Sequence, residues 1–152
     1  MTSLTRRPDT SQQDGRQVYY GDVRVGHIGK RSGVPLHEDQ WGWTLGFHPG
    51  ISARMAGSAS TFEAAREGFA AAWARVVPDL TDAQFEAWRR DRDLQAWKRR
   101  MWDTGCRLPT QNKDGRGQCF CGALLTIRDG TSWPLTEDWV HEARRTAPLR
   151  RS

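Results

Sequence analysis

Alternation of apolar and polar positions marks the first half of the chain as a small antiparallel sheet. In the segment 41–47, large apolar side chains occupy the odd positions, and glycine or threonine occupies the even ones. This period of two predicts a strand with one buried face. Val18–Tyr20 and Val23–Val25 flank Gly21–Asp22, a pattern typical of a hairpin with a two-residue loop. Gly26 then interrupts the alternation and predicts a bulge or a bend.

Helical periodicity replaces this alternation farther along the chain and predicts two helices. The segment Phe62–Val77 is rich in alanine, carries Phe69 and Trp73 on one stripe, and is closed by Pro78. A second helix is expected from Thr81 to a stop near Gly105. The chain therefore predicts an α+β fold, in which a three- to four-stranded antiparallel sheet is packed by two helices and followed by a short cysteine-containing extension.

The second helix carries apolar side chains on two nearly opposite sides. These are Phe85, Trp88 and Trp102 on one side, and Leu94, Trp97 and Met101 on the other. Because tryptophan side chains are costly to leave in water, we favour a helix packed on both sides over an exposed aromatic platform. The side with Leu94, Trp97 and Met101 then needs a cover, either the C-terminal segment or another subunit. It is the candidate partner-binding surface.

The composition divides the chain into four expected parts. Residues 1–16 are polar and are expected to form a disordered arm. Residues 17–105 form the α+β domain, 106–145 a C-terminal extension with a Cys-x-Cys-Gly knuckle, and 146–152 a basic disordered tail. The start lacks the apolar core of a secretory signal, and no apolar run approaches the length of a membrane span. Together with an odd number of cysteines, three, this predicts a cytoplasmic protein without membrane association.

The formal net charge of +5 indicates nucleic acid as a partner, and its position along the chain limits that indication. Residues 34–143 carry thirteen basic and fifteen acidic side chains, so the positive excess lies toward the two ends. The candidate nucleic-acid contacts are Arg24, Lys30 and Arg31 in the hairpin region, and Arg144 and Arg145 in the tail. The small side chains at the even positions of 41–47 favour close packing by another element over base recognition.

The Cys119-Phe-Cys121-Gly element is the motif that most resembles a metal site. With Cys106 and His141 it would make a Cys₃His set for a structural zinc. Paired zinc ligands usually have two to four residues between them, so three reduced cysteines without a metal remain the alternative. No nucleophile, metalloprotease or phosphate-loop motif is present, and we predict no enzymatic activity. Structural zinc is the one cofactor under consideration.

Two resemblances add to this interpretation. The block from Trp41-Gly-Trp43 through Phe47-His-Pro-Gly and Thr61-Phe62 to Arg92-Asp93 is similar to an uncharacterised family of small bacterial hypothetical proteins, which implies no activity. The strands and helix start at 18–66 also resemble the three-strands-then-helix plan of AP2-type DNA-binding domains, including integrase arm-binding modules. That resemblance implies DNA contact from the sheet.

The sequence thus predicts a non-catalytic cytoplasmic binding or regulatory module that acts through protein interaction or self-association. The alternative is a nucleic-acid-binding protein that uses the basic hairpin and terminal arms, with a structural zinc in the C-terminal extension.

Overall fold

The structure is a computed structural model, and it describes residues 3–51, 54–122 and 124–126. The chain divides into two compact units, called here the first unit (Met1–Arg89) and the second unit (Arg90–Ser152). Each unit has its own buried core. We expected a domain to end at residue 105, but the later turns of the second helix pack with the C-terminal extension, and the division falls at Arg89.

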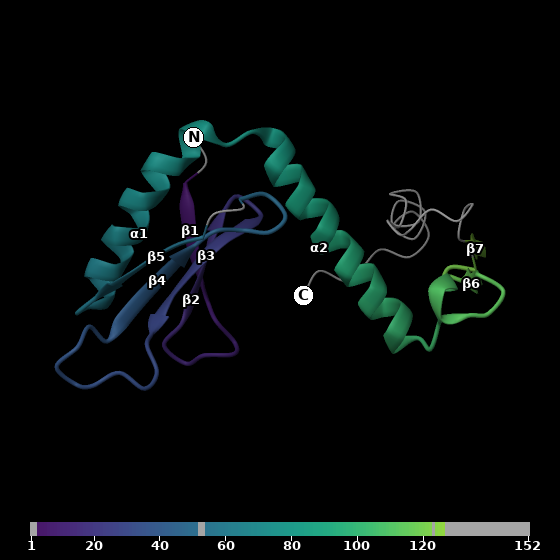
Figure 1. Cartoon of the computed structure of the whole chain (residues 1–152), viewed down its shortest axis with the longest axis horizontal. Helices are drawn as coiled ribbons and strands as arrows, with labels where there is room; N and C mark the ends of the chain where they lie inside the picture. The colour runs from purple at the N-terminus through teal and green to yellow at the C-terminus, as the bar shows by residue number, and fades with distance from the viewer. Residues whose placement is uncertain (1–2, 52–53, 123, 127–152) are drawn as a thin grey trace. The chain divides into compact units, whose positions relative to one another are not determined.

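The predicted α+β class is confirmed, although the main sheet has five strands rather than three or four (Figure 1). The elements are β1 (Leu4–Pro8), β2 (Arg16–Tyr20), β3 (Val23–Lys30), β4 (Trp41–Leu45), β5 (Met55–Ala59), α1 (Phe62–Val76), α2 (Asp82–Asp103), β6 (Arg116–Gln118) and β7 (Leu124–Thr126), with 3-10 turns at Val77–Asp79 and Pro109–Gln111. Strands β1 to β5 form one antiparallel sheet in which neighbours in sequence are neighbours in space. Strands β6 and β7 form a separate antiparallel pair in the second unit.

The predicted hairpin and bulge are both present between β2 and β3. Gly21, in the two-residue loop, has a φ of 62°, which favours glycine. The register between the two strands shifts after Val18, so that Val18 lies opposite Gly26. A side chain at Gly26 would meet the Thr44 carbonyl oxygen at 2.2 Å and the Phe69 ring at 2.5 Å. The bulge therefore places a bare backbone position where strand and helix approach most closely.

Strand β1 lies inside the segment that we expected to be a disordered arm. Its side chains are mostly exposed, and only Leu4 packs against the core. Backbone pairing with β2, from Leu4 opposite Tyr20 to Pro8 opposite Arg16, positions the strand instead. The Arg7 guanidinium also lies over the Tyr19 ring, 4.5 Å from its centre. A strand of this kind leaves no hydrophobic pattern in the sequence.

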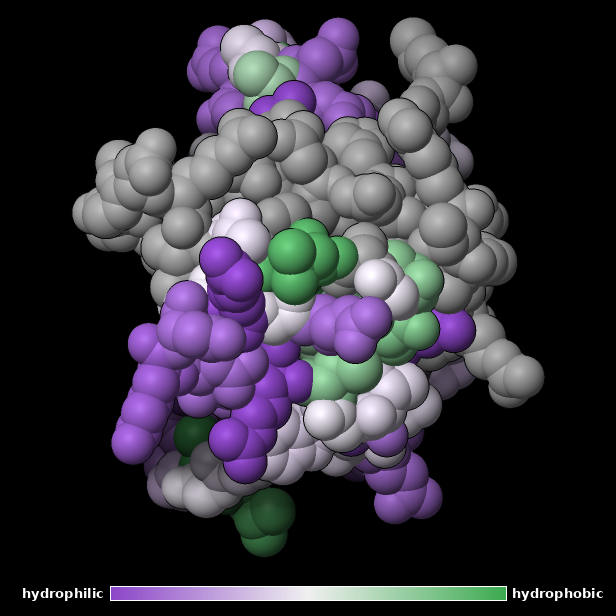
Figure 2. Space-filling view, turned by 90° about the vertical axis from the view of Figure 1, so that its right-hand side faces the viewer, coloured by the Kyte–Doolittle hydropathy of each residue, from purple (hydrophilic) through white to green (hydrophobic). Residues whose placement is uncertain are grey.

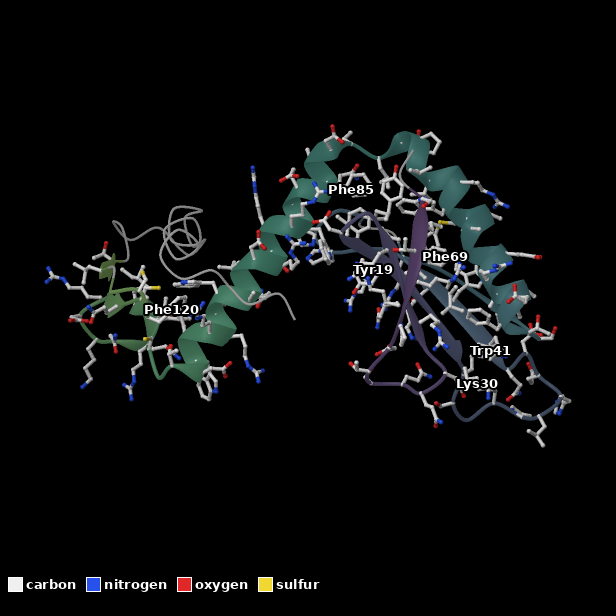
Figure 3. All side chains as sticks on the ribbon, turned by 180° about the vertical axis from the view of Figure 1, so that it is seen from behind. Tyr19, Lys30, Trp41, Phe69, Phe85 and Phe120 are labelled. Carbon is white, nitrogen blue, oxygen red and sulfur yellow. The ribbon has the colours of Figure 1, made fainter. Side chains whose placement is uncertain are left out.

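The core of the first unit lies between the sheet and the helices that cover one of its faces (Figure 1). Phe69 of α1 is 1% exposed and meets the Trp43 ring edge-on, with 6.1 Å between ring centres (Figure 3). The first turns of α2 add Phe85, which stacks on Phe47 at 5.4 Å. Trp88 also packs against this core. One predicted apolar side of α2 thus packs on the sheet in its first turns.

The core of the second unit forms around the other apolar side of α2. Its buried members are Trp97, Met101, Cys119 and Leu125. The cover comes from the extension after the helix, which contributes Leu108, Phe120 and the β6–β7 pair. The Arg100 guanidinium lies 4.5 Å from the centre of the Phe120 ring (Figure 3). The cover that we predicted for this side of α2 is therefore the C-terminal segment of the same chain.

No helix in the described part of the chain is both long and apolar enough to cross a membrane.

Candidate functional site

The three basic residues predicted in the hairpin region do not share one face of the sheet. Arg24 lies opposite Tyr19, on the face away from α1. Arg31 lies on the same face, because a side chain at Gly42 would meet its Cγ at 3.2 Å. Lys30 lies on the helix-covered face, opposite Trp41, and its ammonium is 5.7 Å from the centre of that ring (Figure 3). The Lys30 Nζ atom is also paired with Asp14 Oδ2 at 3.1 Å, so the predicted cationic patch is divided.

The face away from α1 carries small and polar side chains together with three arginines. Its members in the strand register are Thr5, Arg7, Gln17, Tyr19, Arg24, His27, Thr44, Ala56 and Ser58, and Arg31 lies on the same face just after β3. On this side of β4 the Arg31 side chain lies against Gly42. The close approach of another helix or strand, which the small side chains predicted, stays a prediction.

A polar cluster that sequence reasoning missed ties the loop between β1 and β2 to this face. Asp9 Oδ2 lies 3.2 Å from His27 Nε2 and accepts a hydrogen bond from Gln17 at 2.7 Å. The Ser11 hydroxyl, 2.6 Å from Asp9 Oδ1, and the Ser11 backbone N–H hold the pKa of Asp9 below its usual range. His27 Nε2 is a buried atom, and among the described residues it has no hydrogen-bond partner although Asp9 Oδ2 lies close to it. Because Asp9 holds the Ser11 hydroxyl, the cluster stabilises the loop.

The division into units shows where the positive charge lies. Residues 1–89 carry ten basic and ten acidic side chains, whereas residues 90–152 carry thirteen and eight. The whole excess of +5 therefore belongs to the second unit. Within 90–122 and 124–126, the described part of that unit, eight basic side chains face four acidic ones. The range 34–143 shows no positive excess because it combines part of a neutral unit with part of a basic one.

The second unit also exposes a tryptophan beside a hollow. Trp102 is 76% exposed, although its helical neighbour Met101 is 1% exposed. The hollow has a volume of about 470 Å³, and its lining residues are Gln95, Lys98, Arg99, Met101, Trp102, Cys106, Leu108 and Gln111. Figure 2 views the molecule from a side on which hydrophobic side chains lie among hydrophilic ones. A helical projection had placed Trp102 with Phe85 and Trp88, but those residues pack in the first unit and Trp102 belongs to the second.

The three cysteines lie in or against the second core. Trp97 Nε1 donates to Cys119 Sγ at 3.4 Å. The Thr104 hydroxyl donates to the Arg100 carbonyl oxygen at 2.7 Å, and Cys106 Sγ lies 3.5 Å from the same hydroxyl oxygen. The Gly122 N–H donates to the Cys119 carbonyl at 2.8 Å, and Gly122 has a φ of 91°, as a tight knuckle requires. Burial raises the pKa of the Cys119 thiol, which opposes the thiolate that zinc binds.

Within the described residues, no group of three histidine, cysteine, aspartate or glutamate side chains is placed to hold a metal ion. The fourth predicted ligand, His141, lies outside those residues. The Cys₃His zinc site stays a prediction, which zinc analysis of the purified protein tests.

The predicted partner-binding side chains belong to the second core. Trp97 and Met101 are 0% and 1% exposed, and Leu94 packs against them. They need no outside partner for cover, because the chain covers them itself. The remaining predicted contacts, Arg144 and Arg145, lie outside the described residues.

Comparison of the chain with protein-family models, with curated proteins and with solved structures finds no match. The resemblances to an uncharacterised bacterial family and to AP2-type domains therefore stay predictions.

Proposed function

We propose that the protein is a non-catalytic binding module whose ligand is nucleic acid, bound by the second unit. The observation that carries this proposal is the coincidence, within one unit, of the whole positive excess of the chain and a largely exposed tryptophan. Cationic side chains neutralise phosphates, and exposed aromatic rings stack on bases. The side chains that we predicted for a protein partner, Leu94, Trp97 and Met101, lie in or against the second core and so give the protein-interaction prediction no support.

The first unit offers less to a polyanion. Its basic and acidic side chains are equal in number, ten of each, whereas the second unit has thirteen basic and eight acidic ones. Ion pairs hold cations in both units, for example Lys30 with Asp14 in the first and Arg99 with Asp103 in the second, so pairing does not distinguish them. The difference lies in net charge, and a phosphate backbone responds to the net potential that this charge creates.

Fluorescence anisotropy of labelled oligonucleotides at several salt concentrations tests the proposal. We expect binding at low salt that weakens steeply as salt rises, because each neutralised phosphate releases counterions. Lys98→Ala and Arg99→Ala should each lower the slope of log K against log salt by about 1. Arg66→Ala in α1, which removes an exposed cation from the first unit, is the matched control and should leave the slope unchanged. Absence of binding at low salt would rule the proposal out.

Self-association through β5 is a second candidate, favoured by the composition of that edge strand. In the described part of the chain β5 pairs with β4 alone, and its sequence, Met-Ala-Gly-Ser-Ala, contains no charge and no proline. The opposite edge, β1, carries Arg6, Arg7 and Pro8. Charges and proline on an edge strand prevent pairing with another chain, so β5 is the edge open to a second copy.

Light scattering after gel filtration over a range of protein concentrations tests this second candidate. A dimer is expected, and Ala56→Lys should return it to monomer because a lysine on the edge opposes strand pairing. Thr5→Lys, on the exposed side of β1, is the control and should leave the dimer intact. A monomer at every concentration would contradict the candidate.

A further inference from the structure

Trp102 is exposed near the C-terminal end of α2, although it is the largest type of apolar side chain. It points away from the second core, in which the preceding residue, Met101, is buried. Trp102 borders the hollow, and the sides of Met101 and Leu108 that face the hollow give it an apolar wall. An exposed indole presents a large flat apolar surface, and here that surface borders a hollow with an apolar wall rather than standing alone.

Cations lie one helical turn from this ring. Lys98 and Arg99 precede Trp102 by four and three residues, so both lie on the same side of α2 as the indole, and both line the hollow. Arg99 is held by Asp103, with 3.3 Å between Nε and Oδ1, and its side chain is still 79% exposed. The described part of the second unit carries twice as many basic as acidic side chains. The surroundings of the hollow therefore favour an anionic ligand.

Amide side chains complete the lining. Gln95 and Gln111 line the hollow with amide side chains. One group of each already has a partner, because Gln95 Nε2 donates to Asp91 Oδ1 at 3.3 Å and Gln111 Oε1 accepts from the Leu108 N–H at 2.8 Å. Its volume, about 470 Å³, falls in the range of sites that bind small molecules. A flat aromatic surface, an apolar wall, amide groups and nearby cations together match a nucleobase and its phosphate better than they match a peptide.

We propose that the hollow beside Trp102 is a stacking site for an unpaired nucleobase, so that the protein binds single-stranded nucleic acid in preference to a duplex. This inference rests on the proposed function and narrows it. A base in a duplex is already stacked on its neighbours and presents only its edges, whereas a base in a single strand is free to stack on an indole ring. Lys98 and Arg99 then contact the phosphates that flank the stacked base.

The test compares full-length variants on one labelled oligonucleotide, used as a single strand and as a duplex. Trp102→Ala should weaken single-strand binding about 10- to 100-fold and leave duplex binding within twofold. The salt slope of single-strand binding should stay unchanged, because loss of stacking releases no counterions. Trp102→Phe should recover part of the loss. Leu124→Ala is the control, because it removes another exposed apolar side chain of the second unit that lies outside the hollow. It should change the affinity for neither the single strand nor the duplex.

Three other outcomes would contradict the stacking site, the proposed function or both. Equal single-strand affinity of the wild type and Trp102→Ala would overturn the stacking site and leave the proposed function standing. Failure of the wild type to bind either form at low salt would overturn both. An acidic peptide that displaces the single strand from the wild type, and that binds Trp102→Ala less tightly, would assign the hollow to a peptide instead. The circular dichroism spectrum of each variant checks that it folds.

Discussion

At the scale of single residues, Gly26 shows how closely the first unit is packed. The β-bulge at this point brings the backbone of β3 against Phe69 of α1 and against the carbonyl of Thr44 in the next strand. Neither neighbour has room to withdraw, since one is backbone and the other is a buried ring. A methyl group at this position would push apart the helix and the sheet.

We therefore expect Gly26→Ala to destabilise the first unit by about 2 to 3 kcal/mol. Gly42→Ala is the matched control in the adjacent strand, because its new Cβ meets the flexible Arg31 side chain at 3.2 Å and lies at an ordinary contact distance, 3.6 Å, from the Gly57 carbonyl oxygen. Its effect should stay below about 0.5 kcal/mol. Urea unfolding of the two variants measures the difference, and equal stabilities would contradict the packing described for Gly26.

Cys119 makes the stability of the second unit depend on pH. Burial, the largest cause, raises the pKa of its thiol, while the Cys121 backbone N–H and the Trp97 indole oppose that shift. A group whose pKa is higher in the folded state stabilises the fold fully below its unfolded pKa, about 8.5 for cysteine, and this contribution disappears as pH rises through the folded value.

The second unit should therefore lose stability above about pH 8.5, and it should do so less steeply in Cys119→Ala. Hydrogen exchange of the later turns of α2, followed between neutral and alkaline pH, provides the measurement. The two proteins are compared by the slope of stability against pH and not by stability itself, because the alanine variant also loses packing and is less stable at every pH. Parallel slopes in the two proteins would show that Cys119 is not the group responsible.

At the scale of elements, α2 serves two cores with different turns. Phe85 and Trp88 pack in the first unit, whereas Trp97 and Met101 are buried in the second. Trp97 and Trp102 are thus chemically alike and structurally opposite, one 0% and the other 76% exposed.

Trp97→Ala should destabilise the second unit by about 3 to 5 kcal/mol, since it leaves a large cavity and removes the hydrogen bond to Cys119. Trp102→Ala, in the same helix, should cost less than about 1 kcal/mol. Two measurements distinguish the variants: the thermal unfolding temperature of each protein, and the hydrogen-exchange protection of its second unit. A stable Trp97→Ala protein would contradict the core described here.

The elements also show what the sequence can and cannot predict. The alternation in β4, the two-residue loop after Tyr20 and the bulge at Gly26 followed from local pattern, and the structure contains all three. Strands β1 and β6 carry mostly exposed side chains and are positioned by backbone pairing, so periodicity could not reveal them.

The sequence predicted the residue types of the candidate site but not its geometry. Aromatic and basic side chains in the second helix suggested a contact surface, but a helical projection gives directions and not neighbours. It therefore grouped Trp102 with Phe85, although the two belong to different units. The hollow also needs residues 106–111, whose return to the helix no local pattern encodes.

At the scale of the whole molecule, the two units differ in charge, and among the described residues their cores share no buried side chain. We expect their stabilities to respond to separate mutations. Gly26→Ala should lower hydrogen-exchange protection in β3 and β4 and leave β6 and the later turns of α2 unchanged, and Trp97→Ala should do the reverse. Mass spectrometry of exchanged peptides measures both. A common loss of protection in either variant would indicate a single cooperative core.

The exposed ring of Trp102 gives the proposed site its own optical signal. Among the described residues it is the one tryptophan that lies mostly in solvent. An indole in water emits at longer wavelength than a buried one and is open to collisional quenchers such as iodide. Comparison with Trp102→Phe separates its emission from that of Trp133 and Trp139, which lie outside the described residues. A ligand that stacks on Trp102 would then report its own arrival, in that difference spectrum, without any label.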